Sequence, residues 1–144
     1  MNKNENLKQG QLIIINCHNA MVDLLQQYCE RGLNCLCLLK STSKECLIQK
    51  LLLQQAGVNL NIALTKEDYN DLVKAMHDIC KWGLYIDRFQ TFEESNNKIK
   101  QLNPDYVFIE IKRNNTEYNC FKAIAEKQQI GIILVLCNDE LIQI

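Results

Sequence analysis

The chain has 144 residues, of which 47% are hydrophobic and 23% are charged, and its formal net charge is −1. This length and composition fit one soluble globular domain that can bury a substantial core. The near-neutral charge argues against general binding to nucleic-acid backbones, which requires a basic surface. The polar start of the chain is unlike a signal peptide, and the longest apolar run, residues 130–136, is too short to cross a bilayer. We therefore expect a cytoplasmic protein with no membrane contact.

Eight cysteines are many for a chain of this length. A zinc site needs paired cysteines with a second pair or histidines nearby. The only close pair is Cys35 and Cys37, and we expect these side chains to point to opposite faces of a strand, where they could not share a metal. We interpret the eight residues as free, buried thiols that hold no metal and form no disulfides in a reducing compartment.

Strand-like and helix-like segments alternate along the chain. Residues 1–9 are predicted to be a polar lead-in, and residues 10–144 a single domain. Apolar runs predict strands at residues 11–16, 34–39, 84–87, 106–111 and 131–136. Helical spacing and capping residues predict helices over 19–31, from 41–45 to about 56, from 65–68 to 81, over 91–102 and over 116–128.

Each predicted strand is a nearly continuous apolar run, which is typical of strands that are buried on both faces. Such strands, alternating with helices, indicate an α/β fold in which helices cover both sides of a parallel sheet. We therefore predict a three-layer α/β/α sandwich with a mainly parallel, five-stranded sheet.

Several stretches carry a family resemblance. Residues 43–87 contain SKECLIQKLLLQQAGVNL, LTKEDYNDLVKAM and GLYID in that order, followed by DYVFIEI at 105–111 and then AIAEKQQIGIILVLCN. On these motifs, the chain from about residue 10 onward resembles the C-terminal ATPase domain of DnaB-type replicative DNA helicases. The resemblance implies a RecA-like core, of the P-loop NTPase type, that lacks the later strands, the DNA-binding loops and the arginine finger of that domain.

The stretch that aligns with the family's phosphate-binding (Walker A) loop departs from the family pattern. The aligned residues are Cys17, His18, Asn19, Ala20, Met21, Val22, Asp23 and Leu24. A Walker A loop needs glycines that let backbone N–H groups curl around phosphate, a lysine for the β- and γ-phosphates, and a hydroxyl for Mg²⁺. Residues 11–31 contain neither glycine nor lysine, Asp23 reverses the charge at the lysine position, and Leu24 offers no hydroxyl.

Other family positions also differ. The catalytic glutamate of the family aligns with Ser41, the Walker B aspartate with Glu110, and the sensor glutamine with Cys137. We therefore expect a degenerate site that neither binds nor hydrolyses ATP and needs no cofactor or metal. A lone carboxylate binds Mg²⁺ poorly, so we interpret Glu110 as a structural residue at a strand end.

Both histidines have an ordinary interpretation. His18 is expected to be a solvent-facing loop residue, because only Cys17 and Asp23 lie near it in sequence as further ligands. His77 is expected to lie on the surface of a helix.

The aromatic residues Trp82, Tyr85 and Phe89 fit either a binding patch or packing against the sheet. The basic pair at residues 112–113 is too small for a nucleic-acid footprint.

Three functional hypotheses remain open. The first is a non-catalytic pseudo-ATPase that acts in DNA replication through protein contacts. Residues 43–87 would dock on a replicative helicase or another replication protein. Alternatively, the chain would form a homodimer through residues 11–16 at an exposed sheet edge, or through the neighbouring uncovered face. The second is a residual nucleotide-binding or ATPase domain linked to DNA replication, which holds phosphate at Asn19, Ala20 and the helix N-terminus, although Asp23 in the first turn would oppose this. The third is the remnant of a helicase gene that still folds.

Overall fold

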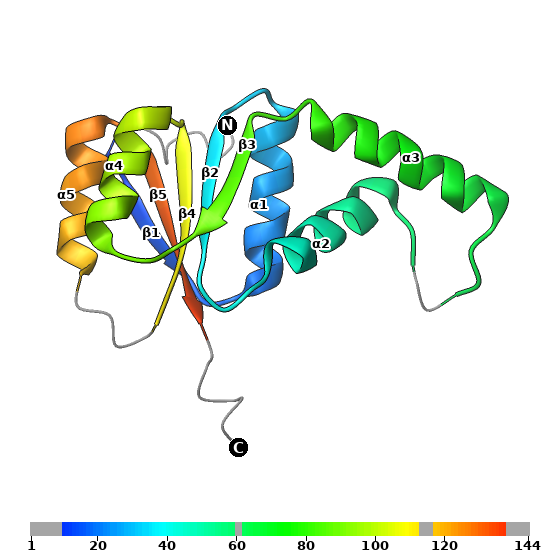
Figure 1. Ribbon diagram of the computed structural model, residues 1–144, viewed down its shortest axis with the longest axis horizontal. Coiled ribbons are helices and arrows are strands. Elements are labelled where there is room, and N and C mark those ends of the chain that lie inside the picture. Colours follow the sequence, from blue (N-terminus) through cyan, green and yellow to red (C-terminus); the bar gives the residue numbers. More distant parts are fainter. Residues whose placement is uncertain (1–9, 60–61, 113–116, 138–144) are drawn as a thin grey trace, which may run out of the picture.

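Strands and helices alternate throughout the computed structural model, which describes residues 10–59, 62–112 and 117–137 (Figure 1). The strands are β1 (Leu12–Ile15), β2 (Cys35–Leu39), β3 (Leu84–Arg88), β4 (Tyr106–Lys112) and β5 (Gly131–Cys137). The helices are α1 (His18–Glu30), α2 (Lys44–Ala56), α3 (Lys66–Cys80), α4 (Phe92–Leu102) and α5 (Tyr118–Gln128). Each predicted element is confirmed, with small shifts at its ends. The predicted lead-in at residues 1–9 lies outside the described residues.

The five strands form one parallel sheet in the order β1-β5-β4-β2-β3. In its register, Leu38 of β2 lies beside Ile109 of β4, and Ile15 of β1 lies beside Val135 of β5. Because all five strands run in the same direction, their carboxyl ends lie together at one end of the sheet. Within the described residues β1 pairs with β5 alone, so its predicted place at a sheet edge is confirmed.

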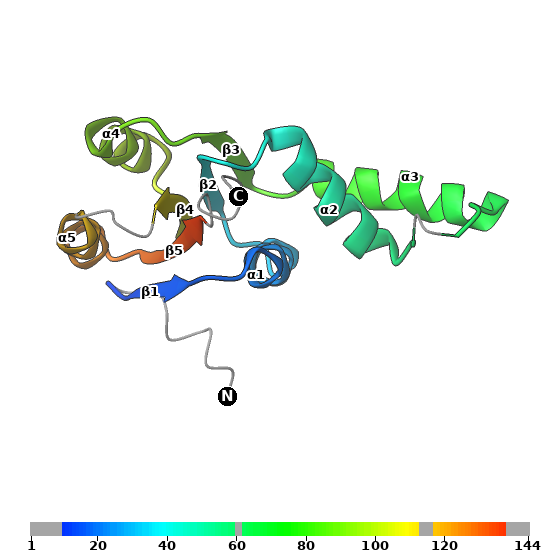
Figure 2. The same ribbon diagram turned by 90° about the horizontal axis from the view of Figure 1, so that it is seen from below.

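Helices cover both faces of the sheet and create two separate cores. Helices α1 and α2 lie on one side, and α4 and α5 lie on the other (Figures 1 and 2). The first core joins residues such as Leu25 of α1 to Phe108 of β4, and the second joins Phe121 of α5 to Val107 of β4. Val107 and Phe108 belong to different cores because successive strand residues point to opposite faces. The predicted three-layer sandwich is confirmed.

Helices α2 and α3 form a hairpin that extends beyond the β3 edge of the sheet (Figures 1 and 2). The Ser43 hydroxyl accepts the N–H of Cys46 and so caps α2. Thr65 and Asp68 form a reciprocal capping box at the start of α3. Gly57, with φ of +69°, ends α2 in the left-handed conformation that glycine adopts without a steric penalty. These local signals fix both ends of α2 and the start of α3.

Candidate functional site

The carboxylate of Glu110, near the end of β4, lies at the centre of a buried hydrogen-bond network. Only 3% of the residue is exposed. Its Oε1 accepts backbone N–H groups from Lys40, Ser41 and Thr42 at 2.8, 3.1 and 3.0 Å. Its Oε2 accepts the hydroxyl of Thr42 at 2.6 Å. These four donors supply the polar contacts that a carboxylate loses when it leaves water.

The strand order explains why residues so distant in sequence meet here. Strands β2 and β4 are parallel neighbours, so the loop that follows Leu39 passes beside residue 110. Three successive amides of this loop, residues 40–42, converge on one carboxylate oxygen. The site is thus at the carboxyl end of the sheet, where open α/β sheets commonly bind ligands.

His18, the first residue of α1, extends the network on the other side of Thr42. Its Nε2 lies 3.0 Å from Oγ1 of Thr42, and its Nδ1 lies 3.2 Å from Nζ of Lys50. A lysine ammonium only donates, so Nδ1 accepts and the proton of the neutral ring is on Nε2. Nε2–H then donates to Thr42, whose own hydroxyl proton is directed to Glu110. The result is a chain of donors that runs from Lys50 through His18 and Thr42 to Glu110.

The surroundings of His18 favour the neutral form of its ring. Partial burial and, next, the Lys50 ammonium lower the pKa of His18 below its ordinary value of 6.5. The Glu110 carboxylate, whose Oε2 lies 3.8 Å from Nε2, opposes this effect more weakly. A neutral His18 agrees with the donor chain, because a protonated ring could not accept from Lys50.

The Thr42 hydroxyl is not in the arrangement in which a neighbouring histidine activates a nucleophile. An activated hydroxyl would donate its proton to a basic ring nitrogen. Here the Thr42 proton faces a carboxylate, and both ring nitrogens of His18 are already engaged.

The positions aligned with the phosphate loop lie almost entirely inside a helix. Helix α1 starts at His18, directly after Cys17, so the chain leaves β1 without an open loop. Met21 and Val22 are buried in the core, Ala20 and Leu24 are partly buried, and Cys17, Asn19 and Asp23 are exposed. Asp23 lies in the second turn of α1, and the first turn carries no acidic residue. The expectation that Asp23 occupies the first turn was therefore wrong.

The remaining aligned positions are close to this network or in the sheet. Ser41 contributes an amide to Glu110, and Cys137 is buried at the end of β5. The prediction that His18 faces solvent from a loop was wrong, because its ring contacts Thr42 and Lys50. Sequence reasoning missed Thr42 and Lys50. Thr42 could have been found from its place after a buried strand, beside the strand that carries residue 110.

The cysteines differ from the prediction in two ways. Cys35 and Cys37 lie in the same core cluster, because residues two apart on a strand share a face. The expectation that they point to opposite faces was wrong. The expectation that every cysteine is buried was also wrong, since Cys17, Cys46, Cys80 and Cys120 are exposed. Among the described residues, no group of three or more His, Cys, Asp or Glu side chains could hold a metal ion.

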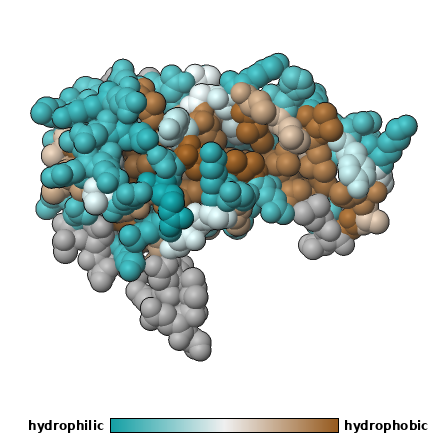
Figure 3. Space-filling view, in the orientation of Figure 1, coloured by the Kyte–Doolittle hydropathy of each residue, from teal (hydrophilic) through white to brown (hydrophobic). Residues whose placement is uncertain are grey.

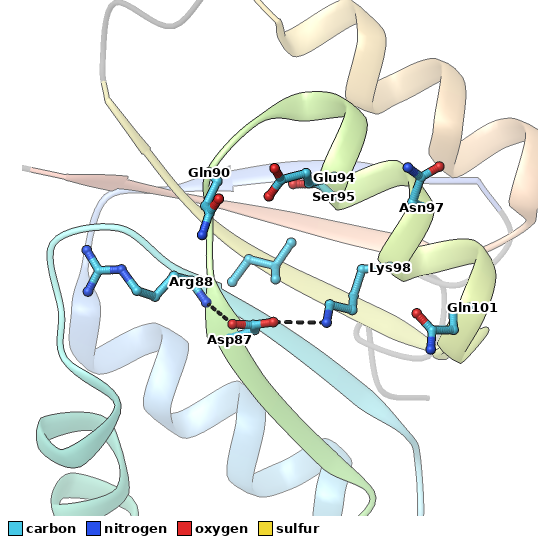
Figure 4. A pocket seen from close by; sticks show the side chains of 9 residues that line it. Asp87, Arg88, Gln90, Glu94, Ser95, Asn97, Lys98 and Gln101 are labelled. Atoms are coloured by element: carbon cyan, nitrogen blue, oxygen red, sulfur yellow. Dashed lines mark hydrogen bonds and ion pairs between the residues drawn. The ribbon is translucent and has the colours of Figure 1, made fainter.

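A second polar feature is a hollow of about 260 Å³ between the end of β3 and α4 (Figure 4). Nζ of Lys98 lies 2.9 Å from Oδ2 of Asp87, and the hydrogen bond between them raises the pKa of Lys98 and lowers that of Asp87. Arg88 and Glu94 add one further charge of each sign to the lining. Because the charges of this hollow are mixed, its electrostatics favour neither anions nor cations.

The α2–α3 hairpin carries an exposed apolar surface. Tyr69, Val73 and Met76 of α3 are 58%, 62% and 54% exposed, and their spacing places them on one face of the helix. Figure 3 shows hydrophobic residues gathered over α2 and α3. We refer to Tyr69, Val73 and Met76 as the α3 stripe. Contiguous apolar side chains of this kind commonly mark an interaction surface.

The remaining predictions concern single residues. Of the two alternatives left open for the aromatic residues, packing in the core describes Phe89, and Trp82 packs against the core while remaining partly buried. It does not describe Tyr85, which is 46% exposed. His77 is on the surface of α3, as predicted. The basic pair lies at residues 112–113, and its second residue is outside the described residues. No helix in the described part of the chain is long and apolar enough to span a membrane.

Comparison with known proteins gives one informative result. No protein-family profile and no curated protein matches the chain. Among solved structures, the chain is similar to a DnaB-like replicative helicase studied for its interactions with primase, with a TM-score of 0.67 and 17% sequence identity. The match covers 90% of this chain but only 40% of the helicase chain. The chain therefore has the α/β fold of that helicase over part of the helicase's length.

Proposed function

We propose that the chain is a non-catalytic, helicase-like domain that acts in DNA replication through protein–protein contacts. The observation that carries the proposal is the start of α1. The segment that would have to wrap a phosphate group is folded into this helix, with Met21 and Val22 in the core. Without unwinding of α1, a phosphate could reach only the N–H groups of the first turn and could not be wrapped by a loop.

The Glu110 network supports the same proposal. In a nucleotide hydrolase, side chains at the carboxyl end of the strands would be free to hold Mg²⁺ or to orient a water molecule. Here both oxygens of Glu110 and both ring nitrogens of His18 are committed to protein partners. Catalysis would require several of these hydrogen bonds to break.

Calorimetry with ATP and Mg²⁺ tests the absence of a nucleotide site. We expect no heat of binding and no phosphate release above a protein-free blank. A dissociation constant below about 1 mM, which corresponds to roughly −4 kcal/mol, would contradict the proposal and favour a residual nucleotide-binding domain.

The proposed contact surface is the α3 stripe. It belongs to residues 43–87, where the sequence most resembles DnaB-type helicases, and it leaves three large apolar side chains in water. We propose that the partner is a replicative helicase.

A pull-down with the replicative helicase of the same organism tests this surface. We expect retention of the helicase by the wild-type chain and its loss in the double variant Tyr69→Ser, Val73→Ser. The matched control is Asp71→Ser, which introduces the same residue at an exposed position on another face of α3. No retention by the wild-type chain, or equal retention by the double variant, would refute the proposed surface.

We also propose self-association through β1. This strand lies at the edge of the described sheet, its sequence LIII carries no charge, and Ile14 is 49% exposed. Uncharged edge strands present unpaired backbone groups to other chains. A homodimer that pairs two β1 strands would cover these groups and Ile14.

A further inference from the structure

The loop between β2 and α2 has the geometry of an anion receptor. The N–H groups of Lys40, Ser41 and Thr42 point to a single oxygen at distances between 2.8 and 3.1 Å. Consecutive amides in this arrangement form a nest that binds anions. Helix α2 starts two residues later, and its N-terminal dipole adds to the positive potential.

The anion in this nest comes from the chain itself. Glu110 places one carboxylate oxygen on the three amides and the other on the Thr42 hydroxyl, 2.6 Å away. A free carboxylate could make the same contacts, because none of them involves the aliphatic part of the glutamate side chain. The site is enclosed, since Glu110 is almost completely buried.

From this geometry we infer that residues 40–42 form a carboxylate-binding site which Glu110 fills from within the chain, and which accepts a free small carboxylate once that side chain is removed. In the variant Glu110→Ala the missing atoms are one methylene and the carboxylate. Acetate consists of a methyl group and a carboxylate, so it matches this space. The inference concerns the nest alone and does not depend on the proposed function.

The substitution would remove the acceptor that the three amides and the Thr42 hydroxyl share in the wild-type chain. Because the loop would lose four hydrogen bonds, it should be weakly held in Glu110→Ala. Acetate would restore its hydrogen bonds by binding the folded state only, which raises the unfolding temperature in proportion to ln(1 + [acetate]/Kd).

Thermal unfolding of three proteins in sodium acetate or sodium chloride at equal ionic strength tests this inference. At about ten times its dissociation constant, acetate should raise the midpoint of Glu110→Ala by roughly 3 °C or more relative to chloride. Wild type should respond equally to both salts. So should Ile109→Ala, the matched control, which opens an apolar cavity at the neighbouring position of β4.

Several outcomes would overturn the inference. One is a rise for Glu110→Ala that is no greater than that for Ile109→Ala. Another is stabilisation of Glu110→Ala by phosphate but not by acetate, because a tetrahedral anion does not match the removed carboxylate. If Glu110→Ala is unfolded in buffer, refolding is followed by circular dichroism in each salt. Recovery only in acetate then supports the inference, and no recovery in acetate refutes it.

Discussion

In the hydrogen-bond network, His18 lies between the Lys50 ammonium and the Thr42 hydroxyl that contacts Glu110. Protonation of His18 therefore affects the stability of the folded chain. Its ring accepts from Lys50 and donates to Thr42, which requires the neutral form. Burial and Lys50 lower the pKa of His18 in the folded chain below the ordinary value of 6.5. As the pH falls below about 6.5, His18 therefore becomes protonated in the unfolded chain before it does in the folded chain.

Because the pKa of His18 is lower in the folded chain, the free energy of unfolding depends on pH. His18 contributes stability that is fully present above pH 6.5 and is lost as the pH falls from there through the lower folded-state pKa. We expect urea unfolding of His18→Gln to show a shallower loss of stability over this range than wild type. His77→Gln, at the exposed histidine of α3, serves as control and should follow the wild-type curve. Parallel curves for wild type and His18→Gln would rule out this role.

The cysteines divide into reactive and protected thiols. Cys17, Cys46, Cys80 and Cys120 are exposed, whereas the other four are buried. A hydrogen bond with the Cys29 thiol, followed by burial, raises the pKa of Cys35, and burial raises the pKa of Cys37. Since the thiolate is the nucleophile, both thiols should be inert.

Titration with a chromogenic disulfide reagent checks this division. We expect four thiols to react rapidly in the native protein and the other four only after addition of denaturant. Rapid native reaction of more than four thiols would show that the core opens more readily than its packing implies.

The residue types at this site could be read from the sequence, but the contacts they make could not. The absence of glycine and lysine from residues 11–31 is a local property that can be read directly. The hydrogen bonds of Glu110 span 68 to 70 residues of sequence, and the contact between His18 and Lys50 spans 32. Such pairs depend on strand order and register, which periodicity does not reveal.

At the scale of elements, prediction succeeded where local signals are strong. Thr65 and Asp68 mark the start of α3, and Gly57 marks the end of α2, because capping requires specific side chains or a specific φ. The start of α1 has a weaker signal in the sequence, because its N-cap, Cys17, makes no side-chain hydrogen bond. The outward position of the α2–α3 hairpin depends on packing between elements and had no local signal.

The capping box of α3 gives a testable consequence. Only Ala75 of α3 is buried, so tertiary packing contributes little and the cap carries more of the helix stability. Thr65→Ala should destabilise α3 by about 0.5–2 kcal/mol. Amide hydrogen exchange should therefore accelerate in α3, while exchange in β4 stays unchanged.

Thr65→Ser keeps the hydroxyl and is the matched control. It should retain the slower exchange of wild type. If Thr65→Ala also left exchange in α3 unchanged, packing against α2 would have to hold this helix instead of the cap.

At the scale of the whole molecule, the two edges of the described sheet differ. The β3 edge has Tyr85 beneath the Lys98 ammonium, 5.0 Å from its ring centre, and it ends in Asp87 and Arg88. Charged groups at an edge discourage pairing with other chains. The β1 edge has no charged side chain, and its Ile14 is half exposed. Self-association is therefore expected at β1.

Light scattering over a range of protein concentrations tests this expectation. We expect a dimer for wild type and a monomer for Ile14→Lys, because each β1 strand of the pair would then have to bury an ammonium group beside its partner. The control is Val73→Lys, which places the same charge at another exposed β-branched residue, in the α3 stripe. It should remain dimeric. A dimer that Val73→Lys dissociates and Ile14→Lys does not would place the interface on the hairpin, and a monomeric wild type at high concentration would exclude self-association through either surface.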